Sequence, residues 1–287
     1  MSDKQRLCLS AGMSFNEIPR IEQLDVIKSA GFDGFFIDKD KHSDWKFTEP
    51  YAEKAAKLGL FFQSIHAPFY GMDDIFHDEG GELADIMISD LINSIDDCAR
   101  FDIPLVIMHA IIGMDNFSPN ELGLQRLEKV IDRAVKQGVI IAFENTEGEM
   151  YLEAILNRYG KLPNVGFCID TGHEMCYNRS QDLIGKYGDL LVSTHLNDNW
   201  GITGDEITFL DDCHLLPFDG VADWTGIAKR LNKCGYDGAL TFEVISRGRK
   251  GLDTNRKYDG MSLEQYVDEA YRKAVQFKEL FCAEKSC

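Results

Sequence analysis

Carboxylate and imidazole side chains recur at the ends of short apolar runs along this 287-residue chain. The run Leu105–His109 ends in a histidine, Val139–Glu144 in a glutamate and Val165–Asp170 in an aspartate. Runs of this length are typical of buried strands, and a buried parallel strand is normally apolar throughout. The polar residues at their ends are therefore candidates for chemistry. The four strongest candidates are Glu144, Asp170, His195 and Glu243.

Such side chains would repel one another and lose hydration if they met in one pocket without compensation. A divalent cation removes the conflict, because Asp, Glu and His supply the oxygen and nitrogen donors that these ions prefer. We therefore predict a metal site at these four residues. A further set is expected to add ligands or to contact substrate: His66, His109, His173, Asp212 and His214. Taken singly, each could be a hydrogen-bonded core residue or a helix N-cap, but six consecutive strands that end this way are hard to explain so.

The elements that must position these residues follow from the apolar pattern. Short apolar runs predict strands at Leu7–Ser10, Gly34–Ile37, Phe61–His66, Leu105–His109, Val139–Glu144, Val165–Asp170, Leu190–His195 and Ala239–Val244. Apolar residues at helical spacing lie between them, most clearly at Ile21–Ile27, Leu127–Val135, Ile227–Cys234 and Tyr266–Phe277. Glycines such as Gly31 and Gly138 stand where these helices should end.

Strict alternation of strands and helices predicts a parallel sheet with right-handed crossovers. Eight such units in a chain of this length predict an α/β fold, a single-domain (β/α)8 TIM barrel over residues 1–287. An open doubly wound sheet is the alternative, although no GxGxxG motif follows the first run to support its dinucleotide-binding version. Long loops follow three strands, on the face where a barrel carries its active site: Ala67–Gly81, Leu196–Val221 and Ile245–Gly260.

Some of these loop residues could contact substrate. Trp45, Phe69 and Trp200 could stack on the ligand of such a site, although loop aromatics often serve packing alone. The loop after the last strand is dense in basic residues, which could bind a phosphate or be balanced by neighbouring acids. They are Arg247, Arg249, Lys250, Arg256 and Lys257.

Composition limits the partners and the compartment. The chain has 30 Lys and Arg against 48 Asp and Glu, a net charge of −18, which disfavours nucleic acids and anionic membranes. We find no apolar run long enough for a membrane span and no secretory signal at the start. The eight cysteines are scattered without a CxxC pair, which favours reduced thiols and a cytoplasmic protein.

Four segments together resemble the xylose-isomerase-like TIM-barrel superfamily. They are Glu144-Asn145-Thr146, Cys168-Ile169-Asp170-Thr171-Gly172-His173, His195-Leu196-Asn197-Asp198, and Glu243. The order and spacing of the pattern cover essentially the whole chain. That superfamily includes sugar isomerases and epimerases of carbohydrate metabolism as well as endonuclease IV, so the resemblance identifies the superfamily more sharply than the reaction.

The first reaction that the resemblance implies is isomerisation or epimerisation of a sugar or sugar phosphate. Glu144, Asp170, His195 and Glu243 would then hold one Mn²⁺, Mg²⁺, Co²⁺ or Zn²⁺ ion. Glu144 and Glu243 would remove and return a carbon-bound proton through an enediolate. His173 resembles the imidazole that contacts a substrate oxygen.

The second implied reaction is that of an endonuclease IV-like phosphodiesterase with three zinc ions, acting on abasic-site DNA. All nine candidate residues match its ligand types. Three features favour sugars: the net charge, the segment from Cys213 to Trp224, which resembles the loop of the sugar isomerases, and the absence of Pro-Gly after His109. Against an exact match to ketose 3-epimerases, no Arg lies between His195 and His214.

Two further expectations stay open. A barrel without catalysis could serve as a sugar-binding module, although both acids of the proton-transfer pair are present. The last helix, at about Leu263–Phe281, could pack in a homodimer.

Overall fold

The computed structural model describes residues 5–113, 118–202, 204–248 and 253–284 of the chain. Within these residues, strands and helices alternate and eight parallel strands form one sheet. The strands are β1 (Leu7–Ala11), β2 (Gly34–Asp38), β3 (Phe61–His66), β4 (Leu105–His109), β5 (Ile140–Glu144), β6 (Val165–Asp170), β7 (Leu191–His195) and β8 (Leu240–Phe242).

The sheet closes on itself. Each strand pairs with its neighbour in the chain from β1 to β7, and β8 pairs with β1. The two ends meet just beyond β7, where the Leu196 amide donates to the Thr241 carbonyl (2.8 Å) and the Glu243 amide donates to the Leu196 carbonyl (3.3 Å). The predicted TIM barrel is therefore confirmed. The doubly wound alternative is wrong, because such a sheet leaves two open edges.

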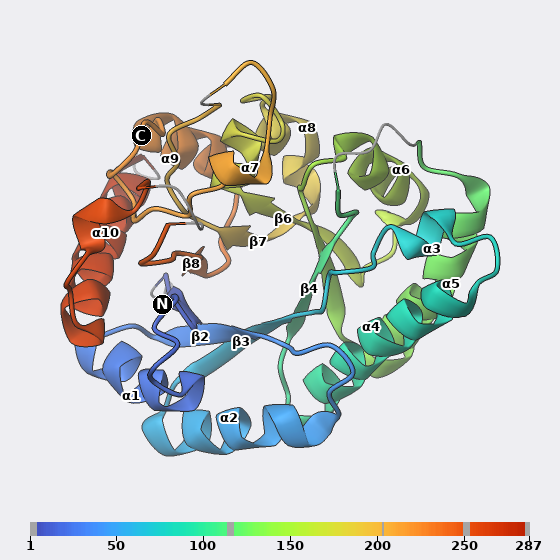
Figure 1. Cartoon of the computed structure of the whole chain (residues 1–287), viewed down its shortest axis with the longest axis horizontal. Coiled ribbons are helices and arrows are strands. Elements are labelled where there is room, and N and C mark those ends of the chain that lie inside the picture. The colour runs from blue at the N-terminus through green and yellow to red at the C-terminus, as the bar shows by residue number, and fades with distance from the viewer. Residues whose placement is uncertain (1–4, 114–117, 203, 249–252, 285–287) are drawn as a thin grey trace.

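Helices surround the barrel, and the first and the last of the long ones lie side by side (Figure 1). The α-helices are α1 (Arg20–Ala30), α2 (Trp45–Leu58), α3 (Asp74–His77), α4 (Glu82–Arg100), α5 (Glu121–Gln137), α6 (Glu149–Tyr159), α7 (Thr171–Met175), α8 (Leu183–Tyr187), α9 (Trp224–Lys233) and α10 (Leu263–Glu284). Short 3-10 helices are η1 (Gly188–Leu190), η2 (Phe209–Asp211) and η3 (Arg256–Tyr258).

Helix ends follow local sequence signals. The Asn120 side chain accepts a hydrogen bond from the Gly123 amide (2.8 Å) and so caps the start of α5. The same helix ends at Gly138, whose φ of 71° is the left-handed conformation that glycine adopts without steric cost. Gly31 ends α1 in the same way, so both predicted stops are confirmed.

Side chains of the barrel divide into two layers. The main apolar core lies between the strands and the helices, and a small second cluster of Ile107, Ala142 and Cys168 is separate from it, inside the barrel. Because side chains alternate along a strand, the residues two positions further on also point inward. These are His109, Glu144 and Asp170, the last residues of their strands. The period of the strand thus aims the predicted site residues into the barrel mouth.

Two predicted helix faces need correction. Val135 is 45% exposed, because it lies about 100° around α5 from the buried Ala134 and leaves the apolar face. Cys234 caps the end of α9 and stands outside the helix. The predicted strands agree with the structure to within a residue or two at each end, and three of them agree fully.

The seven described cysteines are all free thiols, as predicted. None of the described helices combines the length and the apolar character that crossing a membrane requires.

Candidate metal centre and active site

The predicted site residues converge at the carboxyl ends of the strands. His66, His109, Glu144, Asp170 and His195 are the last residues of β3 to β7 in that order, and Glu243 directly follows β8. All six predicted strand ends therefore meet at one end of the barrel. The candidate residues form three groups of donor atoms that lie close enough to hold a metal ion, and a fourth such group adds Cys168 to Glu144 and His195.

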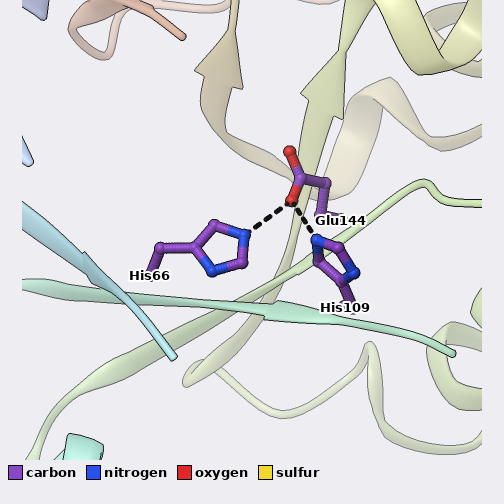
Figure 2. Close-up of side chains that lie close together, drawn as sticks. All are labelled: His66, His109 and Glu144. Atoms are coloured by element: carbon purple, nitrogen blue, oxygen red, sulfur yellow. Dashed lines mark hydrogen bonds and ion pairs between the residues drawn. The ribbon is translucent and has the colours of Figure 1, made fainter. Parts of the chain in front are cut away.

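The first group is built around Glu144. Its Oε2 lies 3.2 Å from Nε2 of His66 and 3.4 Å from Nε2 of His109, so three neighbouring strands each contribute one candidate donor (Figure 2). The Glu144 side chain is fully buried. A carboxylate held in this way is suited to stay in place rather than to move with substrate.

The second group is the predicted four-residue site. Nδ1 of His195 lies 2.7 Å from Oε1 of Glu144 and 2.9 Å from Oε2 of Glu243. Donor atoms of these three residues and of Asp170 all lie within 4.8 Å of one another. The prediction that the four side chains meet around one point therefore agrees with the geometry, and Glu144 belongs to both groups.

Asp170 is held in place by its neighbours. Its Oδ1 accepts a hydrogen bond from the His173 amide (2.6 Å) and caps α7, while Oδ2 accepts from the Asn197 side chain (2.7 Å). The Asn145 side chain bonds both the amide and the carbonyl of Asp170. These contacts give Asn145 and Asn197, which follow Glu144 and His195 in the sequence, a role: they hold the Asp170 carboxylate in its orientation.

The third group joins α7 to the long loop after β7. Nε2 of His173 is 3.4 Å from Oδ2 of Asp212, and Nε2 of His214 is 3.0 Å from its Oδ1. Asp212 and His214 come from the long loop after β7. Paired backbone hydrogen bonds between Asp198 and Leu215 (2.8 and 2.9 Å) fold that loop back over the barrel.

The orientation of three histidines fits metal ligation. His66, His173 and His214 each donate Nδ1–H to a backbone carbonyl, at 2.9, 2.8 and 3.2 Å. The other nitrogen, Nε2, faces a carboxylate in each case; it carries a proton in the charged imidazole and a lone pair in the neutral one. Metal-binding histidines characteristically donate their other ring nitrogen in this manner, which fixes the tautomer. The donor set therefore fits divalent cations.

The electrostatics of the cluster point the same way. Burial from water raises the pKa of Glu144, but His195, His109 and His66 outweigh it and hold that pKa well below its usual range. Burial likewise opposes ionisation of Glu243, yet His195 and His214 lower its pKa to about 2. Burial alone lowers a histidine pKa, but the acids around His195 raise it well above its usual value. The carboxylates are thus charged and available to a cation.

The remaining groups differ among themselves. Burial raises the pKa of Asp170 to about 6, whereas His214 and His173 outweigh burial at Asp212 and hold that pKa well below normal. Acids around His214 raise its pKa to about 9 against the effect of burial. Burial prevails at His109, whose pKa is lowered. A cation that binds these histidines must displace their protons.

A cavity of about 660 Å³ opens above the cluster. Its polar lining includes Asp38, His66, His109, His173, Asp212, His214 and Glu243. Its apolar wall includes Phe69, Tyr70, Ile112, Tyr177 and Phe209. Glu144, Asp170 and His195 are 0% exposed and form the layer below. Of the two proposed proton-transfer acids, Glu243 is the one that faces the cavity.

The aromatic residues singled out in the sequence have different surroundings. Phe69 lines the cavity and stacks on the His109 ring at 4.5 Å, as expected for a substrate-facing position. Trp45 is the first residue of α2 and packs under the guanidinium of Arg100 (4.9 Å). Trp200 is 41% exposed and donates to the Thr254 carbonyl (3.3 Å). Neither tryptophan lines the cavity.

Basic residues of the loop after β8 are partly neutralised. Arg247 pairs with Glu17 (3.0 Å), and Lys257 pairs with Asp219. Arg249 and Lys250 lie outside the described residues. Of the described residues that line the cavity, none is Lys or Arg. A phosphate-binding patch therefore gains no support within the described part of the chain.

Sequence reasoning missed Asp38. It ends β2 in register with His66 on β3 and lines the same cavity. Burial raises its pKa, which the charge of His66 only partly offsets. The signal was present, because the run that begins at Gly34 ends in an acid like its neighbours. The predicted strand stopped one residue short, at Ile37.

Comparisons with other proteins agree with the fold. A sequence model that describes the xylose isomerase-like TIM barrel family matches residues 24–272. The uncharacterized protein y4fM of Sinorhizobium fredii is 28% identical over 262 residues, which cover 77% of this chain and 79% of that protein. A probable endonuclease 4 of Cenarchaeum symbiosum is 28% identical over 134 residues, 43% of this chain and 46% of that protein.

Solved structures with the same fold include sugar epimerases. D-allulose 3-epimerase from Methylomonas sp., solved in complex with D-allulose, has a TM-score of 0.68 at 16% identity and covers 97% of this chain and 98% of its own. The IOLI protein, solved with a bound zinc atom, has a TM-score of 0.72 at 16% identity and covers 98% of this chain and 100% of its own.

Proposed function

Since this chain belongs to the xylose isomerase-like TIM barrel family, we propose that it is a metal-dependent isomerase or epimerase of sugars. One observation carries the proposal: Glu144, Asp170, His195 and Glu243 bring their donor atoms within 4.8 Å of one another, directly below a cavity. Solved epimerases of the same fold support it, because the structure of one of them contains the ketose D-allulose.

The residues divide the work according to their exposure. A divalent cation held by the four donors supplies Lewis-acid polarisation of a sugar carbonyl. Glu243 is the only one of the four that lines the cavity, with 19% of its side chain exposed, so it exchanges a carbon-bound proton with the substrate. Glu144 anchors the centre, because histidine nitrogens face both its oxygens. Its second role, as the partner in proton return, requires that it be freed from one of them.

The cavity favours an uncharged substrate. Its described lining carries the acids Asp38, Glu147, Asp212 and Glu243 and lacks Lys and Arg. A phosphate would meet these acids and find, besides the cation, only histidines that already face carboxylates. We therefore propose an unphosphorylated sugar ahead of a sugar phosphate.

Solvent proton exchange tests this function. The full chain is loaded with Mn²⁺ and incubated with a panel of ketoses in D₂O, and deuterium incorporation is followed by mass spectrometry. We expect incorporation together with an epimeric or isomeric product, and loss of both after chelation. Full activity in protein stripped of metal by a chelator would refute the metal-centred mechanism.

A second candidate is an endonuclease IV-like phosphodiesterase. The observation that favours it is the presence of all three donor groups, which give a possible place to each of three zinc ions and share Glu144 between two of them. The partial similarity to a probable endonuclease 4 adds support. Three zinc ions would neutralise a phosphate without any Lys or Arg.

Metal analysis and DNA nicking separate the two candidates. One ion per chain favours the sugar enzyme, and three zinc ions favour the phosphodiesterase. Chelator-sensitive nicking of an abasic-site duplex would establish the second activity. A protein with neither activity would leave the non-catalytic sugar-binding barrel.

A further inference from the structure

Asp38 occupies a strand-end position that no metal group uses. Phe36, two residues earlier in β2, stacks on the His195 ring inside the barrel at 4.7 Å. Side-chain alternation then places Asp38 on the same inward face, one layer higher. Its register with His66 puts it level with the ligands. Asp38 nevertheless belongs to none of the three donor groups.

The Asp38 carboxylate makes no hydrogen bond or ion pair with the described residues, although the charges of His66, Arg20 and His195 act on it from further away. Arg20 donates to the backbone carbonyl of Asp38 instead (3.3 Å). The site carboxylates Glu144, Asp170, Asp212 and Glu243, in contrast, all contact histidines or amides. The half-buried Asp38 side chain faces the cavity instead. A half-buried carboxylate without a hydrogen-bond donor is suited to a ligand that supplies such donors.

We propose that Asp38 is a substrate-contacting residue, whose carboxylate accepts hydrogen bonds from hydroxyl groups of a polyhydroxylated substrate. The inference rests on the proposed sugar substrate and adds a specificity residue to it. An ionised carboxylate has only acceptors, so it matches the hydroxyl donors of a sugar or polyol. The same charge repels a phosphate group or a carboxylate at this end of the cavity.

Ribitol binding tests the assignment without relying on turnover. The full chain is loaded with Mg²⁺, and ribitol is titrated into wild type, Asp38→Asn and Asp40→Asn by ligand-observed NMR. Asp40 is the matched control, because it is an exposed acid two residues away whose nearest cation is Arg20 at 3.9 Å. Metal content is measured for all three proteins.

We expect Asp38→Asn to keep its metal and to bind ribitol about tenfold more weakly, because a hydrogen bond to a charged group is replaced by a neutral one. Asp40→Asn should behave as wild type. Equal ribitol affinity in Asp38→Asn and wild type, no ribitol binding by wild type, or loss of metal from Asp38→Asn would each overturn the assignment. Ribitol binding through Asp38 without ketose turnover would instead count against the proposed isomerase. If the wild type turns over ketoses and Asp38→Asn binds ribitol as tightly as wild type, the result would count against this inference alone.

Discussion

Two acids of the site have opposite surroundings. Glu144 is fully buried and surrounded by three histidines, whereas Glu243 reaches the cavity. Contacts on both oxygens favour a fixed ligand, and access to the cavity favours proton transfer. The same residue type therefore serves two purposes, according to its depth in the barrel.

Replacing Glu243 tests this division. We expect Glu243→Gln to reduce deuterium exchange by at least about 10²-fold, because the amide cannot accept the substrate proton. Glu22→Gln, at an exposed position in the first turn of α1, is the control and should exchange at the wild-type rate. Exchange that survives in Glu243→Gln would transfer the proton-accepting role to another group.

Because acids surround His214, we predict that the free energy of unfolding of the metal-free protein depends on pH. The pKa of His214 is raised from 6.5 to about 9, so the group stabilises the fold fully below about pH 6.5 and loses this effect as the pH rises through about 9. The full effect is at most about 3 kcal/mol. In urea unfolding, the free-energy gap between wild type and His214→Gln should shrink from about pH 6 to about pH 10. A gap that does not change with pH would contradict the raised pKa.

At the residue scale, sequence alone predicted one group, the four residues Glu144, Asp170, His195 and Glu243, but not how the other candidates divide. Six of the nine candidates were identified at strand ends, and His173, Asp212 and His214 in the segments that follow. The spacing of these last three carries no information on whether they share a cation. Asp38 was not among the candidates, because the predicted strand ended at Ile37, one residue before the end of β2. That its carboxylate has no hydrogen-bond partner among the described residues depends on the tertiary structure and cannot be read from the local sequence.

Among the elements, the long loop after β7 has to be fixed because it carries Asp212 and His214. Asp219, further along this loop, accepts hydrogen bonds from Tyr258 (2.8 Å) and Lys257 and pairs with Lys273 of α10. The side chains of Asp219 and Lys273 are almost fully buried. This contact ties the loop to the last helix.

We expect Asp219→Asn to destabilise the protein by about 3 kcal/mol, because it leaves the Lys273 ammonium buried with only Glu269 nearby, at 3.8 Å. Urea unfolding measures the loss. The double variant Asp219→Asn/Lys273→Met removes the stranded charge and should recover part of it. An unchanged midpoint in Asp219→Asn would show that the contact does not hold the loop.

Periodicity and helix stops were sufficient to predict the eight strands and their alternation with helices, but not the short helices α3, α7 and α8. The ion pair between Asp219 and Lys273, and the packing of Trp45 under Arg100, join distant segments and could not be predicted from local patterns. The cavity wall is likewise made by loops whose course depends on such contacts.

Over the whole molecule, the charge of −18 opposes binding to DNA. We expect fluorescence anisotropy at physiological salt to find a Kd for an abasic-site duplex weaker than about 10⁻⁴ M, the weak end of non-specific binding. Tighter, chelator-sensitive binding would favour the phosphodiesterase. The homodimer through α10 stays a prediction; that helix already buries Tyr266, Ala274 and Phe277 in the core of its own chain.

Anomalous diffraction from crystals grown with Mn²⁺ tests the central claim most directly. We expect a single dominant peak within bonding distance of Glu144, Asp170, His195 and Glu243, beneath the cavity. Crystals in which the four side chains remain bound to one another, with no peak between them, would contradict the account.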